Sequence, residues 1–143
     1  MADVPRTPAV HGVLETCLYA DDLEAARRFY AEVLGLPLVL GEPDRHMFFR
    51  CGASMLLIFN PERTSGSETH VPTHGCRAPV HVAFSMAPEE VAAWRARLAA
   101  HGVVIEDEIQ RAGGVSLYFR DPAGNSLELA TPSIWGLPDP QSR

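Results

Sequence analysis

Hydrophobic and polar residues alternate in two stretches that open similar halves of the chain. The stretches cover residues 13–19 and 80–86. A period of two is typical of a strand with one buried face. Each stretch is followed by apolar residues at helical spacing, and Gly35 and Gly102 stand where these two helices would end. The pattern therefore predicts a strand followed by a helix, twice.

Helix-start signals support both predicted helices. Asp21 and Asp22 precede the first one as candidate N-caps, and Glu24 follows Asp21 by three residues, as in a capping box. Pro88 suits the first turn of the second helix.

Three more strands are predicted in each half, which makes the chain an α+β protein of two tandem βαβββ modules. Phe48-Phe49-Arg50 in the first half matches Tyr118-Phe119-Arg120 in the second. We expect one domain over residues 1–143. The strands are predicted at 37–40, 46–50 and 54–59, then at 103–106, 115–120 and 126–130. The modules are assigned to 12–60 and 80–131, with a connector or lid at 61–79.

Composition excludes several classes of function. The 143 residues carry a net charge of −6 without a basic cluster, which argues against a nucleic-acid partner. All 12 basic residues are arginine, so lysine chemistry is excluded. No apolar run is long enough for a membrane span, and no secretion signal is recognisable, so we expect a cytoplasmic protein. The odd number of unclustered cysteines predicts reduced thiols.

Three side chains form a candidate metal site. Alternation places Glu15, His81 and Glu128 on the less bulky faces of their strands. Glu15 and His81 are equivalent in the repeat, and Glu128 corresponds to about Leu56. Two carboxylates and one imidazole suit a divalent ion and leave coordination positions open for substrate.

Other residues are candidates for lining a substrate pocket. Cys17 and Tyr19 share the face of Glu15. An anionic group of the substrate can bind to His46, Arg50 or Arg120. Surface charge or a structural ion pair is the commoner role for each of these three residues. His74 can reach the site from the connector, where a plain loop role is the alternative. Trp135 can cap the cleft or a partner chain, but simple packing is the preferred expectation.

The sequence resembles the vicinal oxygen chelate superfamily, which includes glyoxalases, bleomycin-resistance proteins and ring-cleaving dioxygenases. The stretches that carry the resemblance are 14–30 with 33–36, then 80–84 and 119–129. The resemblance implies an open, cupped mixed sheet, often completed by a second chain, and hence a homodimer. It also implies one divalent ion (Zn, Ni, Mn or Fe) on Glu15, His81 and Glu128.

Some positions depart from individual members of that superfamily. Glyoxalase I-like members usually have a fourth ligand where this chain has Leu56. Dioxygenases use a histidine where Glu15 stands. Fosfomycin enzymes typically have threonine in place of Cys17, and they use a lysine that this chain lacks.

The expected function is a metal-dependent, glyoxalase-like enzyme of the lyase or isomerase type. Its substrate would be a small oxygenated molecule chelated to the ion, with Glu128 or Glu15 as the base. One alternative is an Fe(II)-dependent ring-cleaving dioxygenase. Another is a non-enzymatic dimer of the bleomycin-resistance type that binds a drug or metabolite.

Overall fold

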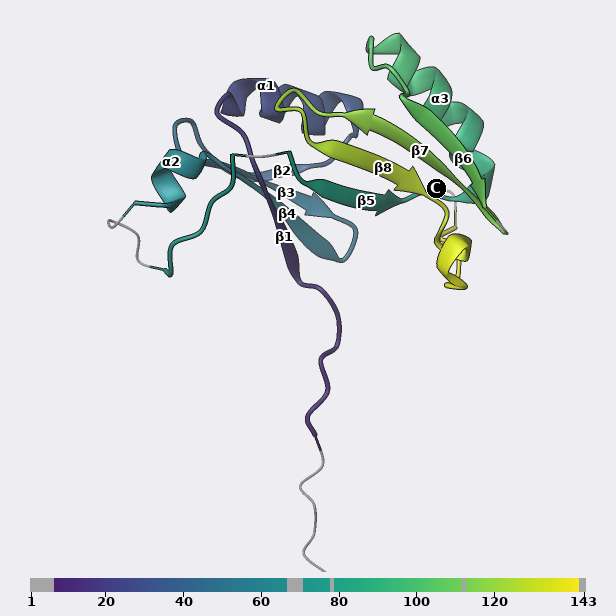
Figure 1. Ribbon diagram of the computed structural model, residues 1–143, viewed down its shortest axis with the longest axis horizontal. Helices are drawn as coiled ribbons and strands as arrows, with labels where there is room; N and C mark the ends of the chain where they lie inside the picture. Colours follow the sequence, from purple (N-terminus) through teal and green to yellow (C-terminus); the bar gives the residue numbers. More distant parts are fainter. Residues whose placement is uncertain (1–6, 67–70, 78, 112, 142–143) are drawn as a thin grey trace, which may run out of the picture.

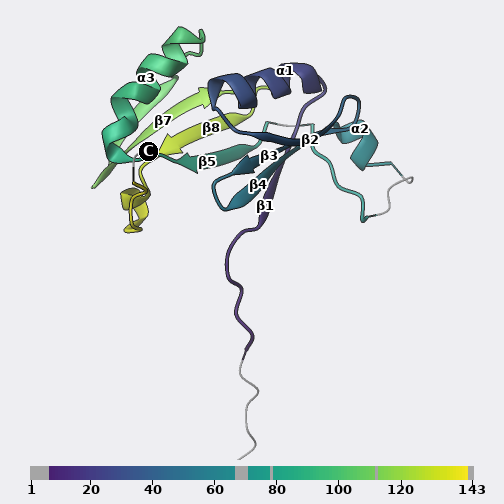
Figure 2. The same ribbon diagram turned by 180° about the vertical axis from the view of Figure 1, so that it is seen from behind.

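The computed structural model describes residues 7–66, 71–77, 79–111 and 113–141. The chain forms two four-stranded sheets, each with a helix on one face (Figure 1). Seen from behind, α1 and α3 again lie on the same side of the two sheets (Figure 2). The predicted fold class, two tandem βαβββ modules, is therefore confirmed.

The elements follow the repeat in chain order. The first module contains β1 (Glu15–Tyr19), α1 (Leu23–Arg28), η1 (Phe29–Val33), β2 (Leu38–Glu42), β3 (His46–Cys51) and β4 (Ser54–Phe59). The second contains β5 (His81–Ser85), η2 (Pro88–Glu90), α3 (Val91–Ala100), β6 (Asp107–Arg111), β7 (Gly114–Arg120) and β8 (Ser126–Ala130). A short helix, α2 (Pro61–Thr64), begins the connector, and a 3₁₀ turn, η3 (Pro132–Trp135), follows β8.

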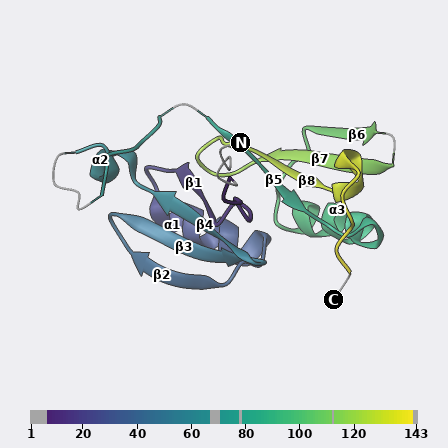
Figure 3. The same cartoon turned by 90° about the horizontal axis from the view of Figure 1, so that it is seen from below.

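Both sheets have the same topology. Their strand orders are β1-β4-β3-β2 and β5-β8-β7-β6, and in each the first strand pairs in parallel with the last. The two sheets lie side by side, with β1 and β5 as edge strands (Figure 3). In the described part of one chain, the face of each sheet away from its helix is only partly covered: Phe48 and Tyr118 are partly exposed there, whereas Leu57 and Ser116 are buried.

The strand register corrects one predicted equivalence. Cys17 pairs with Leu57 in the first sheet, and the corresponding pair in the second is Ala83 with Glu128. Leu57 is therefore the counterpart of Glu128. Leu56 points to the opposite face and is buried in the core.

The strand predicted at 103–106 is wrong. The ladder with β7 is formed by Asp107–Arg111 instead. Val103 and Ile105 alternate as a strand would, but they lie in a loop where they pack against the core. The polar β6 lies at the sheet edge, where exposed strands carry polar residues.

Local signals set the helix limits. Asp22 is the N-cap of α1 and accepts a hydrogen bond from Ala25 N at 2.9 Å. The capping box predicted from Asp21 is therefore wrong, and the Glu24 side chain pairs with Arg27 instead. The α-helix gives way to a π-helical turn at Phe29, and the chain reverses at Gly35, whose φ is +69°.

A buried hydrogen-bond network joins the two modules. Tyr30 on η1 donates to the Asp121 carboxylate at 2.6 Å. Asp121 also accepts from the side-chain amide of Asn125 at 2.9 Å. All three residues are at least 94% buried, so the modules are held together by polar groups in a dry environment.

Among the described residues, no helix is both long and apolar enough to cross a bilayer. The three cysteines Cys17, Cys51 and Cys76 are free thiols, as predicted.

Candidate metal centre

The candidate ligands lie on the sheet faces that point away from the helices, which we call the open faces. On the first sheet, Leu18 and Ile58 face the core, so their neighbours in sequence face the opposite way. Three rows of paired residues cross this open face: Glu15, Met55 and Arg50; Cys17, Leu57 and Phe48; Tyr19, Phe59 and His46. The equivalent rows on the second sheet are His81, Ser126 and Arg120; Ala83, Glu128 and Tyr118; Ser85, Ala130 and Ser116.

His81 and Glu128 are in contact on the second open face. Nε2 of His81 lies 3.2 Å from Oε2 of Glu128, and the Glu128 side chain is 8% exposed. His81 is half exposed, and its ring is stacked beside Tyr118 with centroids 6.3 Å apart. A nearly buried carboxylate therefore points at an imidazole nitrogen at the protein surface.

The hydrogen bond on the other side of the imidazole defines what this pair can bind. Nδ1 of His81 lies 2.9 Å from the carbonyl oxygen of Ser126. A carbonyl only accepts, so Nδ1 donates, and Nε2 is the ring nitrogen that faces Glu128 and can bind a metal ion. Backbone carbonyls orient metal-binding histidines in this way. A lone pair and a carboxylate that face each other suit a shared cation, so the donor set fits a divalent metal ion.

Glu15 does not join this pair within one chain. It is exposed on β1, the edge strand of the first sheet. Across the described part of the chain, no three His, Cys, Asp or Glu side chains are arranged to hold a metal. The expectation that all three ligands meet is therefore not fulfilled by a single copy.

The pocket candidates on the first open face form a connected group. Burial, with a smaller effect of Glu15, raises the pKa of the Cys17 thiol, so this cysteine is a neutral thiol rather than a reactive thiolate. Tyr19 Oη and Nδ1 of His74 are 2.7 Å apart and share a hydrogen bond. His74 thus brings the connector onto the open face. Burial lowers the pKa of His46, which keeps its ring neutral near pH 7.

The two arginine candidates differ in their surroundings. Arg50 and Arg120 occupy equivalent places, Arg50 one residue before the end of β3 and Arg120 at the end of β7. Arg120 forms an ion pair with Glu106 at 3.1 Å and donates to the Gly124 carbonyl at 3.0 Å. It therefore has the structural role that was the alternative expectation. Arg50 is exposed in the same row as Glu15.

Two further findings concern aromatic residues. The Trp135 side chain is 75% exposed, so the expectation that it simply packs is wrong. The sequence pattern gave Tyr118 no place in the candidate site, although it pairs across the strands with Glu128. The alternation of β7 is the signal that could have placed it on the open face.

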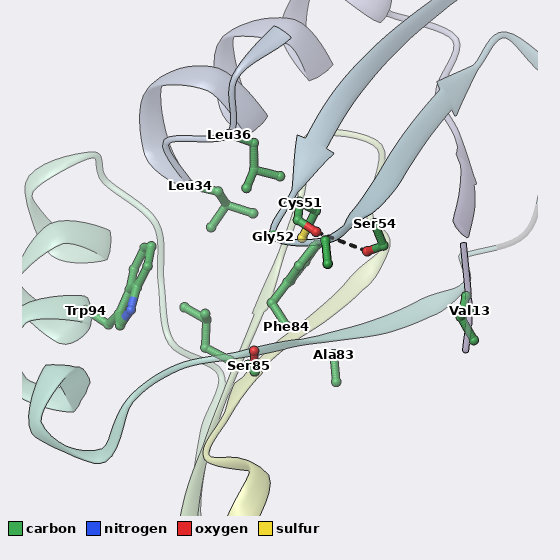
Figure 4. Close-up of a pocket in the computed structure, with 12 residues that line it drawn as sticks. Val13, Leu34, Leu36, Cys51, Gly52, Ser54, Ala83, Phe84, Ser85 and Trp94 are labelled. Atoms are coloured by element: carbon green, nitrogen blue, oxygen red, sulfur yellow. Dashed lines mark hydrogen bonds between the residues drawn. The ribbon is translucent and has the colours of Figure 1, made fainter. Parts of the chain in front are cut away.

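A cavity of about 640 Å³ lies between the modules. Leu34, Leu36 and Trp94 border it on one side, while Ala83 and Ser85 of β5 and the β3–β4 turn border it on the other (Figure 4). None of the three candidate ligands lines this cavity. It is a mostly apolar gap that begins beside the open faces rather than a metal site.

These features define the class of protein. The Glyoxalase/Bleomycin resistance protein/Dioxygenase superfamily matches residues 12–129, and the chain belongs to that superfamily.

Individual relatives narrow the comparison. The crystal structure of a lactoylglutathione lyase from Agrobacterium tumefaciens is 39% identical, with a TM-score of 0.87 over 91% of this chain and all of that one. The metallothiol transferase FosB of Shouchella clausii (strain KSM-K16) is 29% identical over 87% of this chain and 83% of its own length. The fosfomycin resistance protein FosX of Listeria monocytogenes, crystallised as a mutant with Mn(II), is 24% identical and shows the shared fold alone. Its TM-score is 0.64 over 85% of this chain and 90% of that one.

Proposed function

We propose that this protein is a metal-dependent, glyoxalase-like enzyme of the lyase or isomerase type. It acts on a small oxygenated substrate whose adjacent oxygens bind a divalent ion. His81 and Glu128 of one copy hold that ion together with Glu15 of a second copy in a homodimer. The observation that carries the proposal is the 3.2 Å contact between Nε2 of His81 and the Glu128 carboxylate, with Nδ1 tied to a carbonyl.

The role of a second copy follows from the position of the open faces. A twofold axis places the first sheet of one copy against the second sheet of the other, and it generates two identical sites. Exposed apolar side chains beside the open faces fit such an interface, with Val13 75%, Leu14 74% and Trp135 75% exposed. The extended segment before β1 projects away from its own sheets and can reach the partner (Figure 1).

The residues supply acid–base chemistry around the bound substrate. The ion, when present, would polarise a substrate oxygen and stabilise the negative charge that develops on it. Glu15 or Glu128 would take a proton from the carbon next to that oxygen and return it to the neighbouring carbon. Of the two, Glu15 is exposed and better placed to exchange a proton, whereas Glu128 is buried against His81.

The comparisons support the lyase assignment over the alternatives. The relative with 39% identity over the whole of its chain is a lactoylglutathione lyase by name. The paired His81 and Glu128 also favour an enzyme over a protein that only binds a drug. Activity with the hemithioacetal of methylglyoxal and glutathione is the first assay. Oxygen uptake with catechol would instead favour the dioxygenase.

Metal content tests the site directly. We expect about one equivalent of divalent metal per chain by elemental analysis, and a large loss in Glu15→Ala, His81→Ala and Glu128→Ala. Glu42→Ala is the matched control because Glu42 is an exposed strand carboxylate in the row of His46. Full metal content in Glu128→Ala would refute the assignment.

A mixing experiment tests whether two copies share the site. Glu15→Ala and Glu128→Ala homodimers each lack one ligand in every site. In a mixed dimer, one site regains all three ligands and the other loses two. Random exchange makes half the dimers mixed, so about a quarter of all sites recover metal. No recovery, with both variants folded and exchanging, would contradict the shared site.

A further inference from the structure

The first open face carries a continuous group of aromatic rings that the proposed chemistry does not use. The rings of His46 and Phe48 are stacked, with centroids 4.1 Å apart and planes 16° apart. Phe59 meets Phe48 edge-on at 5.2 Å and His74 edge-on at 4.8 Å. Tyr19 completes the group through its hydrogen bond to His74. We call these five residues the aromatic wall.

The aromatic wall is not part of the protein core. None of its members belongs to the buried cluster that packs under α1 and α3, and all five are partly exposed. Phe49, next to Phe48 in sequence, is fully buried on the opposite face. The wall therefore faces the open side, where a ligand or a second copy would lie.

The wall contains no carboxylate or arginine, although the exposed Glu42 carboxylate of β2 borders it, 4.0 Å from Nδ1 of His46. Among the residues of β1, β3 and β4 on this face, Arg50 is the only arginine, and it lies in the row of Glu15 rather than among the rings. His46 is neutral because burial lowers its pKa, so its ring packs on Phe48 as a flat apolar surface. Such a surface favours apolar, flat groups over charged ones.

The strand geometry relates the wall to the candidate ligand. Cys17 and Tyr19 follow Glu15 on the same face of β1. With a rise of about 3.3 Å per residue, Tyr19 lies about 13 Å beyond Glu15. Phe48 belongs to the middle row, with Cys17 and Leu57. A substrate whose oxygens are held beside Glu15 would extend its remaining atoms over Phe48 and toward Tyr19.

We propose that the aromatic wall selects substrates that carry an aromatic or similarly flat unsaturated group next to the two metal-binding oxygens. This inference rests on the proposed function, because the metal site fixes the oxygens. Phe48 provides the main contact, and the Tyr19–His74 pair closes the far end of the pocket. Phe48 is a specificity-determining residue and takes no part in the proton transfer.

Two hydroxamates test the inference because they have the same metal-binding group. Benzohydroxamate adds a phenyl ring to this group, whereas acetohydroxamate adds only a methyl group. In calorimetry with protein loaded with Zn²⁺, Ni²⁺ or Mn²⁺, we expect benzohydroxamate to bind at least about tenfold more tightly, from the extra apolar area buried. The comparison removes the contribution of the metal contact itself.

Variants assign the preference to the wall. In Phe48→Ala and in the milder Phe48→Leu, the ratio of the two affinities should fall by at least about threefold while acetohydroxamate affinity stays unchanged. Unchanged acetohydroxamate affinity also shows that the variant is folded. Val104→Ala, which removes an apolar group that is 75% exposed elsewhere, is the control. Equal affinities in the unmodified protein, or a ratio that Phe48 substitutions leave intact, would overturn the inference.

A metal-free measurement separates this inference from the proposed function. If the protein holds no metal and binds neither hydroxamate, the proposed function fails. Fluorescence titration of the metal-stripped protein with 2-naphthol then decides about the wall. Binding that weakens severalfold in Phe48→Ala supports an aromatic-binding surface, and absence of binding refutes it.

Discussion

The hydrogen bond from Tyr30 to Asp121 should be a main source of stability between the two modules. In Tyr30→Phe, Asp121 loses a donor at 2.6 Å but keeps the side-chain amide of Asn125 and two backbone donors. The Asp121 carboxylate therefore loses one of its hydrogen bonds but is not left unpaired. A hydrogen bond to a charged group is worth about 1.5–3 kcal/mol, so we expect a loss of about 2 kcal/mol in the free energy of unfolding.

Urea denaturation at fixed protein concentration measures this loss, and the slope with denaturant should not change. The corresponding fall in melting temperature is about 6 °C for a chain of this size. Tyr118→Phe is the control, because the Tyr118 hydroxyl only accepts a hydrogen bond from the exposed Arg111 at 3.2 Å. Equal losses in the two variants would show that the buried network does not hold the modules together.

The same substitution has a signature in alkali. Burial, and then the charge of Asp121, raise the pKa of Tyr30 well above 10. Because the pKa is raised, the neutral phenol contributes fully to the free energy of unfolding below pH 10, and this contribution is lost as the pH rises through the pKa of Tyr30 in the folded protein. The unmodified protein should therefore lose stability above pH 10, and Tyr30→Phe should lose less over the same range.

Three further substitutions test other parts of the fold. His46 has a lowered pKa, so the neutral ring contributes fully to the free energy of unfolding above pH 6.5, and this contribution is lost as the pH falls below that value. In a plot of the free energy of unfolding against pH, His46→Phe should therefore show a smaller fall in this range. Gly114→Ala would place a methyl group 2.2 Å from Thr131 Oγ1 and 2.6 Å from a carbon of Ile134. Urea titration should therefore show a loss of about 2–3 kcal/mol in the free energy of unfolding. A loss below about 0.5 kcal/mol, which is usual for surface substitutions, would contradict the crowding. Arg97→Ala removes two hydrogen bonds, of 2.6 and 2.7 Å, to the backbone carbonyls at the end of η1. By the same titration it should lower the free energy of unfolding by about 1–2 kcal/mol. Arg95→Ala, which removes an exposed ion pair, should lower it by less.

The repeat made most of the fold predictable. Ser54–Phe59 and Ser126–Ala130 were predicted at their observed limits, because each is bounded by turn residues. The strand before Gly114 was misplaced because alternation in sequence cannot tell a strand from a loop that packs alternate side chains on the core. Val103 and Ile105 satisfy both descriptions.

The error over Leu56 has a precise cause in the β3–β4 turn. Cys51 and Ser54 pair as the last residues of the two strands, so the turn contains only Gly52 and Ala53. Arg50 pairs with Met55 and Arg120 pairs with Ser126, so Met55 is the counterpart of Ser126. Matching the serines Ser54 and Ser126 instead shifts the register by one residue. A shift of one residue exchanges the two faces of a strand, which is why Leu56, a core residue, was compared with Glu128.

The corrected register bears on how two copies can combine. The second sheet supplies His81 and Glu128, whereas the first supplies Glu15 and has Leu57 where a second ligand would stand. Contact between like sheets would gather four ligands at one place and two at the other. Contact between unlike sheets gives three at each of two equivalent places, which leaves room for substrate oxygens. Alternation within a strand predicts which face a ligand occupies but not which copy the opposing sheet belongs to, so the sequence alone could not separate these arrangements.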